Sequence, residues 1–165
     1  MIKKILDPLP HAMPSDNQIQ EAGENLDFIK QLSKSFVQEL EDNTYYSSKI
    51  SVASITTFLG KILQNAYDSI YLANNSSKPR IVLEASKTED MIRITIEDNG
   101  RGFLDTTSPI NNLKSTAKQH SVPFGGNGSA LKAVFEELNE LGGSIVRENK
   151  QNNTGAVIII NLPTK

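Results

Sequence analysis

Residues 92–97 alternate apolar and polar side chains, and a further carboxylate follows at Asp98. This period-two pattern is typical of a β-strand with one buried face, and the buried face here contains Ile92, Ile94 and Ile96. The same alternation places Asp98 on the apolar side of the strand. A carboxylate in that position is costly unless a donor hydrogen-bonds it. The segment therefore predicts a sheet with one covered face, and a hydrogen-bond donor close to Asp98.

Helical periodicity elsewhere in the chain indicates what covers this sheet. The predicted helices are 17–42, 52–72 and 129–141, and the predicted strands are 80–86, 91–97, 143–147 and 156–162, with a possible short edge strand at 44–50. Because short turns join neighbouring strands, we expect a mixed or antiparallel sheet. With helices on one face of that sheet, the fold class is a two-layer α/β sandwich of the α+β type.

The first 16 residues differ in character from the rest of the chain. Pro8, Pro10 and Pro14 disfavour a regular helix or a central strand there. We therefore expect an extended arm at 1–16 and one domain at 17–165. The first helix of that domain has an apolar stripe that either packs on the domain itself or forms a homodimer contact.

Composition excludes several classes of function. The chain has 165 residues and no cysteine, which excludes disulfides and thiolate metal sites. A formal net charge of −2 gives no sign of a nucleic-acid surface. No apolar run approaches the roughly 20 residues that a membrane helix needs. We therefore expect a cytoplasmic protein without a membrane segment.

Two glycine-rich segments are candidates for ligand contact. Gly100 and Gly102 follow Asp98, where they permit positive φ and close approach of the backbone to a flat ligand. A simple Asx-turn is the alternative there. Gly126 and Gly128 precede the last predicted helix, whose N-terminus and backbone N–H groups suit a phosphate. This second segment matches neither a Walker loop nor a dinucleotide fingerprint.

A polar cluster lies on the predicted helix at 52–72. With an advance of about 100° per residue, Lys61, Asn65 and Asp68 share a face that is distinct from the apolar stripe. Asparagine is a poor helix former, and its amide oxygen suits Mg²⁺, which prefers oxygen ligands. A solvated polar face is the alternative explanation of the same residues.

Taken in order, these segments resemble the motifs of the GHKL (Bergerat-fold) ATPase superfamily, which includes gyrase, heat-shock chaperones, histidine kinases and MutL. The segment LGKILQNAYDSI is similar to the N box, DNGRGF to the first glycine box and FGGNGSALKAV to the second. The closing segment LGGSIVRENKQNNTGAVIIINLP is similar to the last strands of histidine-kinase catalytic domains. The resemblance covers residues 49–163 and implies a Bergerat fold that binds ATP and Mg²⁺.

The resemblance also implies roles for single residues. Asn65 corresponds to the asparagine that binds Mg²⁺, and Asp68 is expected to contribute to nucleotide binding beside it. Asp98 corresponds to the aspartate that recognises adenine, and Gly100 and Gly102 correspond to the glycines that line the base.

The segment 103–124 corresponds to the ATP lid of these proteins. Within it, KSTAK resembles the lid of the citrate- and dicarboxylate-sensing kinases. By that match Lys114 or Lys118 contacts the phosphates, and Gly126 and Gly128 are the glycines of the phosphate loop.

Lys61 departs from the family pattern. One helical turn before the main asparagine, histidine kinases usually carry a second asparagine, and gyrase-type ATPases carry the glutamate that activates water. A charged lysine performs neither task. The resemblance therefore supports nucleotide binding but identifies no catalytic base, and we expect impaired hydrolysis.

Three functions are compatible with these observations. The first is a histidine-kinase-like ATP-binding domain of two-component signalling, which phosphorylates a phosphoacceptor or response-regulator protein in trans. Residues 17–48 contain no histidine, so we do not expect self-phosphorylation. The alternatives are a nucleotide-dependent binding switch and an anti-sigma-type serine kinase, although kinases of the latter type normally keep the glutamate that Lys61 replaces.

Overall fold

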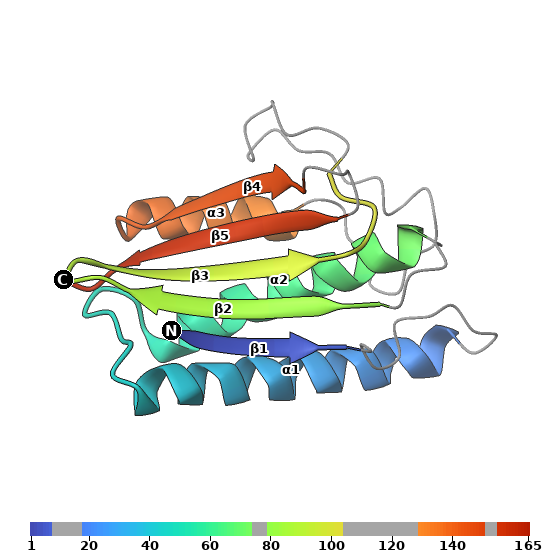
Figure 1. Ribbon diagram of the computed structural model, residues 1–165, viewed down its shortest axis with the longest axis horizontal. Helices are drawn as coiled ribbons and strands as arrows, with labels where there is room; N and C mark the ends of the chain where they lie inside the picture. Colours follow the sequence, from blue (N-terminus) through green and yellow to red (C-terminus); the bar gives the residue numbers. More distant parts are fainter. Residues whose placement is uncertain (8–17, 74–78, 104–128, 151–154) are drawn as a thin grey trace.

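The computed structural model describes residues 1–7, 18–73, 79–103, 129–150 and 155–165 (Figure 1). Its elements follow in the order β1 (Ile2–Leu6), α1 (Gln18–Asp42), α2 (Val52–Ala73), β2 (Ile81–Lys87), β3 (Met91–Asp98), α3 (Ser129–Glu140), β4 (Ser144–Asn149) and β5 (Ala156–Pro163). Within these described residues, no helix combines the length and the apolar character that crossing a bilayer requires.

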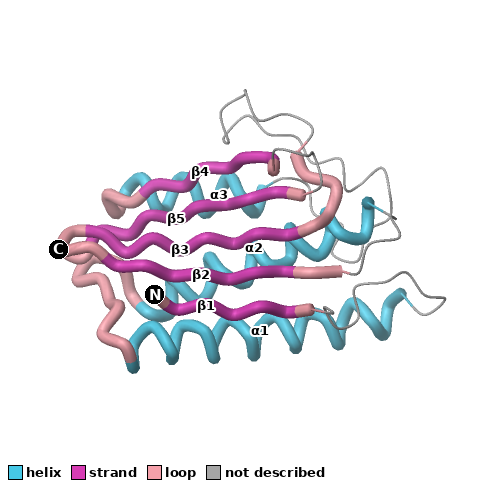
Figure 2. The backbone as a smooth tube through the Cα atoms, in the orientation of Figure 1, coloured by secondary structure: helices cyan, strands magenta, loops and turns pink. Residues whose placement is uncertain are grey.

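The described strands form one sheet in the order β1-β2-β3-β5-β4, in which every neighbouring pair is antiparallel. The helices lie on one face of this sheet, so the molecule has two layers (Figure 2). The predicted two-layer α+β fold is confirmed. Of the two sheet types that the sequence left open, the antiparallel one is present.

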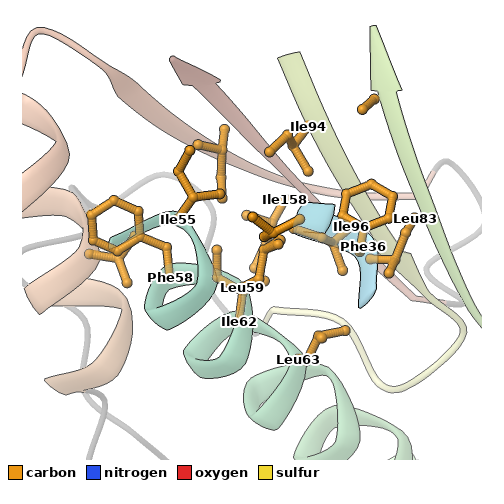
Figure 3. Close-up of a cluster of buried hydrophobic side chains, with 14 of the residues drawn as sticks. Phe36, Ile55, Phe58, Leu59, Ile62, Leu63, Leu83, Ile94, Ile96 and Ile158 are labelled. Carbon is orange, nitrogen blue, oxygen red and sulfur yellow. The ribbon is translucent and has the colours of Figure 1, made fainter. Parts of the chain in front are cut away.

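The central strand β3 has the buried face that its alternation predicts. Ile92, Ile94 and Ile96 are buried, whereas Arg93 between them is exposed. Their side of the sheet packs against the apolar stripe of α2 (Figure 3), which contributes Ile55, Phe58, Leu59, Ile62 and Leu63 to the core. Since burying one large apolar side chain stabilises a fold by roughly 1.5–3 kcal/mol, this contact fixes α2 on the sheet.

The apolar stripe of α1 belongs to the same core. Ile29, Phe36 and Leu40 are almost completely buried, and α1 packs beside α2. This stripe therefore packs within the chain, which is one of its two expected roles, and the homodimer contact stays a prediction.

The sheet edge is formed by a segment other than the one predicted. Residues 44–50 form no strand, because Thr44 has a φ of 63° and the Ser47 hydroxyl accepts two backbone N–H bonds, at 3.1 and 3.2 Å. Such local bonds compete with strand pairing. The edge is instead Ile2–Leu6, which pairs with β2. This strand is not among those that the sequence predicts. It ends before Pro8, so the prolines do not interrupt it.

The ends of α2 and α3 lie within about one residue of their predicted positions, and so does the end of α1. Gly23 favours a firm helix only from about residue 25, whereas α1 already begins at Gln18. The Ser51 hydroxyl accepts a hydrogen bond from the Ser54 N–H at 3.1 Å and caps α2. Gly142, with a φ of 80°, ends α3, and the Gly143 N–H donates to the Leu138 carbonyl at 2.8 Å.

Candidate functional site

The carboxylate of Asp98 is at the centre of the candidate site. It ends β3 with only 5% of its surface exposed, which confirms its predicted place on the apolar side. Its Oδ1 accepts hydrogen bonds from the Gly100 N–H at 2.8 Å and from the Ser69 hydroxyl at 3.2 Å. The hydrogen bond from Gly100 is the bond of an Asx-turn. The Asx-turn that the sequence offered as an alternative is therefore present, and the Asp98 carboxylate is buried as well.

Burial raises the pKa of the Asp98 carboxyl from 3.8 to about 6. Hydrogen bonds from Gly100, Ala156 and Ser69 and the charge of Lys150 lower this pKa without offsetting the loss of hydration. The protein therefore stabilises the ionised carboxylate incompletely. A ligand with an exocyclic amino group would supply a further donor, because an ionised carboxylate only accepts hydrogen bonds.

Packing within the protein requires Gly100 and Gly102. A Cβ on Gly100 would meet the Ser69 carbonyl carbon and lie 2.5 Å from the Ile70 nitrogen. Gly102 has a φ of 81°, and a Cβ on it would lie 2.7 Å from Oδ1 of Asn149. The loop backbone thus lies directly on α2 and on the end of β4. The described contacts of these two glycines are with the protein, and their predicted approach to a ligand stays a prediction.

A stripe of polar side chains along α2 begins beside Asp98. Ser69, which donates to Asp98, also accepts a hydrogen bond from the Gly102 N–H at 3.2 Å. Asn65 and Lys61 precede Ser69 at four-residue intervals, so the three side chains share a helix face. At 1.5 Å per residue, they lie about 6 and 12 Å from Ser69 along the axis. Both are half-buried, and the structure brings them into line with the Asp98 loop.

Asp68 is more deeply buried than Lys61 and Asn65. With an advance of about 100° per residue, it lies about 20° from Lys61 and about 60° from Asn65 around the helix, so the three residues share a side of α2, as predicted. Only 8% of Asp68 is exposed, whereas the other two are half-buried, so Asp68 does not belong to a solvated face.

Three residues that hold the Asp98 loop were missed by sequence reasoning: Ser69, Asn149 and Gly155. The Asn149 side chain is hydrogen-bonded to Phe103. Gly155 has a φ of 144°, and a Cβ there would overlap the Asp98 carbonyl oxygen. A serine at helical spacing from the polar cluster, and a glycine directly before the last strand, were signals that could have identified two of them. Nothing in the local sequence marks Asn149.

The phosphate side of the predicted site lies outside the described residues. This applies to Lys114, Lys118, Gly126 and Gly128, and to the remainder of the expected lid. Helix α3 does begin at Ser129, directly after the glycine cluster, as predicted. Where the chain is described, no three His, Asp or Glu side chains are grouped so that they could hold a metal ion.

Comparison with known proteins relates the chain to ATPases. Residues 52–165, more than half of the chain, match the family described as histidine kinase-, DNA gyrase B-, and HSP90-like ATPase. The mycobacterial sensor histidine kinase MprB aligns with a TM-score of 0.54 and 18% identity, over 70% of this chain and 74% of that one. The nucleotide-free catalytic domain of histidine kinase ThkA aligns with a TM-score of 0.54 and 15% identity, over 99% of each chain. A comparison with curated protein sequences finds no match.

The raised pKa of Asp98 predicts a pH dependence of stability. A carboxyl whose pKa rises from 3.8 to about 6 on folding stabilises the fold when protonated, and this stabilisation is lost as the pH rises through 6. Between pH 7.5 and pH 5, the parent should gain about 1 kcal/mol of unfolding free energy relative to Asp98→Asn. Urea denaturation at several pH values measures the difference. Unfolding free energies of the parent and of Asp98→Asn that change in parallel with pH would contradict a raised pKa of Asp98.

Proposed function

Because the chain belongs to the family of histidine kinase-, DNA gyrase B-, and HSP90-like ATPases, we propose that it binds Mg²⁺·ATP and transfers the γ-phosphoryl group to a partner protein. The ATP-binding, histidine kinase-like character follows from the family itself. The proposal adds the magnesium ion, a role in two-component signalling in the cytoplasm, and a phosphoacceptor or response-regulator protein as the partner.

The observation that carries the proposal is the incompletely stabilised carboxylate of Asp98. Its donors come from the loop, from α2 and from β5, yet burial still raises its pKa to about 6. The amino group of adenine is a donor of the kind that an ionised carboxylate in this position needs. We assign Asp98 to adenine recognition on this basis, with Gly100 and Gly102 keeping the loop in contact with α2.

Asn65 is suited to the phosphate end of the same nucleotide. It lies one helical turn from Ser69 and is half-buried, so it faces the same side of α2 as the contact with Asp98. A single amide oxygen fits Mg²⁺, which keeps waters and phosphate oxygens as its other ligands. When bound with ATP, Mg²⁺ supplies positive charge that stabilises the phosphates.

Transfer in trans is supported by the composition of α1, which contains no histidine. In the proposed reaction the bond between the γ-phosphorus and the ADP oxygen breaks, and a bond to a nucleophilic side chain of the partner forms. Catalysis of such a transfer consists mostly of positioning and charge stabilisation. The residues described above provide positioning, because Asp98 and Asn65 hold the two ends of the nucleotide.

Lys61 favours a second candidate function, a nucleotide-dependent binding switch. The lysine lies on the stripe of Asn65 and Ser69, about 6 Å along the helix from Asn65. In its charged form it attracts phosphates but does not accept a proton from water. A site with this lysine and no other base would bind ATP and hydrolyse it slowly.

The binding assignment predicts that two variants lose different ligands. Asp98→Asn places an amide donor opposite the adenine amino group, so its affinity for both adenosine and Mg²⁺·ATP should fall at least about tenfold. Asn65→Ala should weaken Mg²⁺·ATP much more than adenosine, because only the phosphate end is affected. Calorimetry measures both affinities.

Asp90→Asn is the matched control for this experiment, since Asp90 is exposed in the turn before β3. It should bind both ligands as the parent does. Unchanged affinity in Asp98→Asn, or equal losses of both ligands in Asn65→Ala, would contradict the respective assignment.

The Lys61 interpretation predicts slow ATP hydrolysis by the parent and faster hydrolysis by Lys61→Glu, because a carboxylate can act as the base. Phosphate release measures the rate, and Lys30→Glu on the exposed side of α1 is the matched control. A parent that hydrolyses ATP rapidly would show that Lys61 is no defect. Transfer of label from ATP to a partner protein would favour the kinase over the binding switch.

A further inference from the structure

The side chain of Asn149 binds both backbone groups of Phe103. Its Oδ1 accepts a hydrogen bond from the Phe103 N–H at 2.7 Å, and its Nδ2 donates to the Phe103 carbonyl at 2.8 Å. One side-chain amide thereby supplies the acceptor and the donor that a neighbouring strand would offer. Since Asn149 is the last residue of β4, an edge strand is attached directly to the loop that begins at Asp98.

The ring of Phe103 is held by the same strand. The guanidinium carbon of Arg147 lies 5.6 Å from the centroid of the ring, a separation at which a cation and an aromatic ring attract each other. Arg147 precedes Asn149 by two residues, so both side chains are on the same side of β4. Only 6% of Arg147 is exposed. Two side chains of one strand thus fix the backbone and the ring of one loop residue.

A continuous series of contacts connects Asn149 to Asp98. A Cβ on Gly102 would lie 2.7 Å from the Asn149 Oδ1, so the loop backbone and this amide are in direct contact. The Gly102 N–H donates to the Ser69 hydroxyl at 3.2 Å, and that hydroxyl donates to Asp98 at 3.2 Å. Displacement of the backbone at Gly102 and Phe103 therefore changes the arrangement of donors around the carboxylate.

We propose that Asn149 is a positioning residue for nucleobase recognition, in that it fixes the loop against which Asp98 selects an amino-substituted purine. This role rests on the proposed nucleotide function and deepens it. Adenine presents an amino donor where hypoxanthine presents a carbonyl oxygen, which an ionised carboxylate repels. The preference for ADP over inosine diphosphate is therefore the property that Asn149 controls, in addition to affinity.

The test uses Asn149→Asp in the full chain. This variant keeps the size of the side chain and one acceptor oxygen, but it places a second oxygen opposite the Phe103 carbonyl. Calorimetry should show that ADP binding weakens about tenfold and that the preference over inosine diphosphate shrinks. Without nucleotide, hydrogen exchange of the Phe103 amide should become faster than in the parent.

Asn161→Asp is the matched control, because it introduces the same charge on β5, where Asn161 is hydrogen-bonded to Arg93 and Ser144. It should leave ADP affinity, base preference and Phe103 exchange unchanged. If Asn149→Asp does not fold, Asn149→Ser removes the amide without adding charge and is measured in the same way.

The possible results separate this role from the proposed function. A parent that prefers ADP, together with an Asn149 variant of equal affinity and equal preference, overturns the role of Asn149 and leaves nucleotide binding intact. Weaker binding of both diphosphates by the same factor also overturns it, since that shows a structural effect without base selection. A parent that binds neither diphosphate overturns the nucleotide function and this role together.

Discussion

The cost of burying one carboxylate determines how this site is built. Asp98 ends a strand whose other inward residues are isoleucines, and its ionised form has lost most of its hydration. Its donors come from three parts of the chain: the adjoining loop at Gly100, helix α2 at Ser69, and strand β5 at Ala156. Helix α2, the loop and the end of the β4–β5 pair must therefore meet at this point. The glycines of the site follow from the same requirement, because backbone approaches backbone there.

These donors do not offset the whole free-energy cost of burying the ionised carboxylate. A ligand that donates a further hydrogen bond can lower the cost that remains. A pKa raised from 3.8 to about 6 corresponds to about 3 kcal/mol by which the ionised form is disfavoured. Perturbed pKa values of this kind are concentrated at functional sites. The large core between α2 and the sheet (Figure 3) tolerates this cost. A ligand that donates a hydrogen bond to the carboxylate recovers part of it, which links recognition of an amino group to the stability of the fold.

The sequence predicts the structure correctly where a short-range pattern reflects a single physical requirement. The alternation through Ile92, Ile94 and Ile96 located Asp98 on the buried side, and helical periodicity located α2 and α3. The prediction from sequence is wrong where the structure depends on contacts between segments far apart in the chain. The sheet edge next to β2 could be formed by Ile2–Leu6 or by residues 44–50. The choice depends on which segment can pair with β2, and the local sequence of neither segment contains that information.

The same limit applies to the site itself. Asn65 and Asp98 could be selected as candidates because ordered motifs surround them. Ser69 could be found only by extending the helical spacing beyond Asn65. The burial of Asp68, of which only 8% is exposed, could not be predicted from its place among polar residues, because it depends on how α2 packs. The contact of Asn149 with Phe103 joins residues 46 positions apart, and no local pattern in either segment predicts it.

A ¹³C NMR titration of the Asp98 carboxyl with and without saturating adenosine tests the role of this carboxylate most directly. We expect a pKa of about 6 in the free protein. We also expect a clear decrease in this pKa when adenosine is bound, because a donor to the ionised form stabilises that form. A pKa that is unaffected by saturation with adenosine, or that increases, would contradict the assignment of Asp98 to adenine recognition.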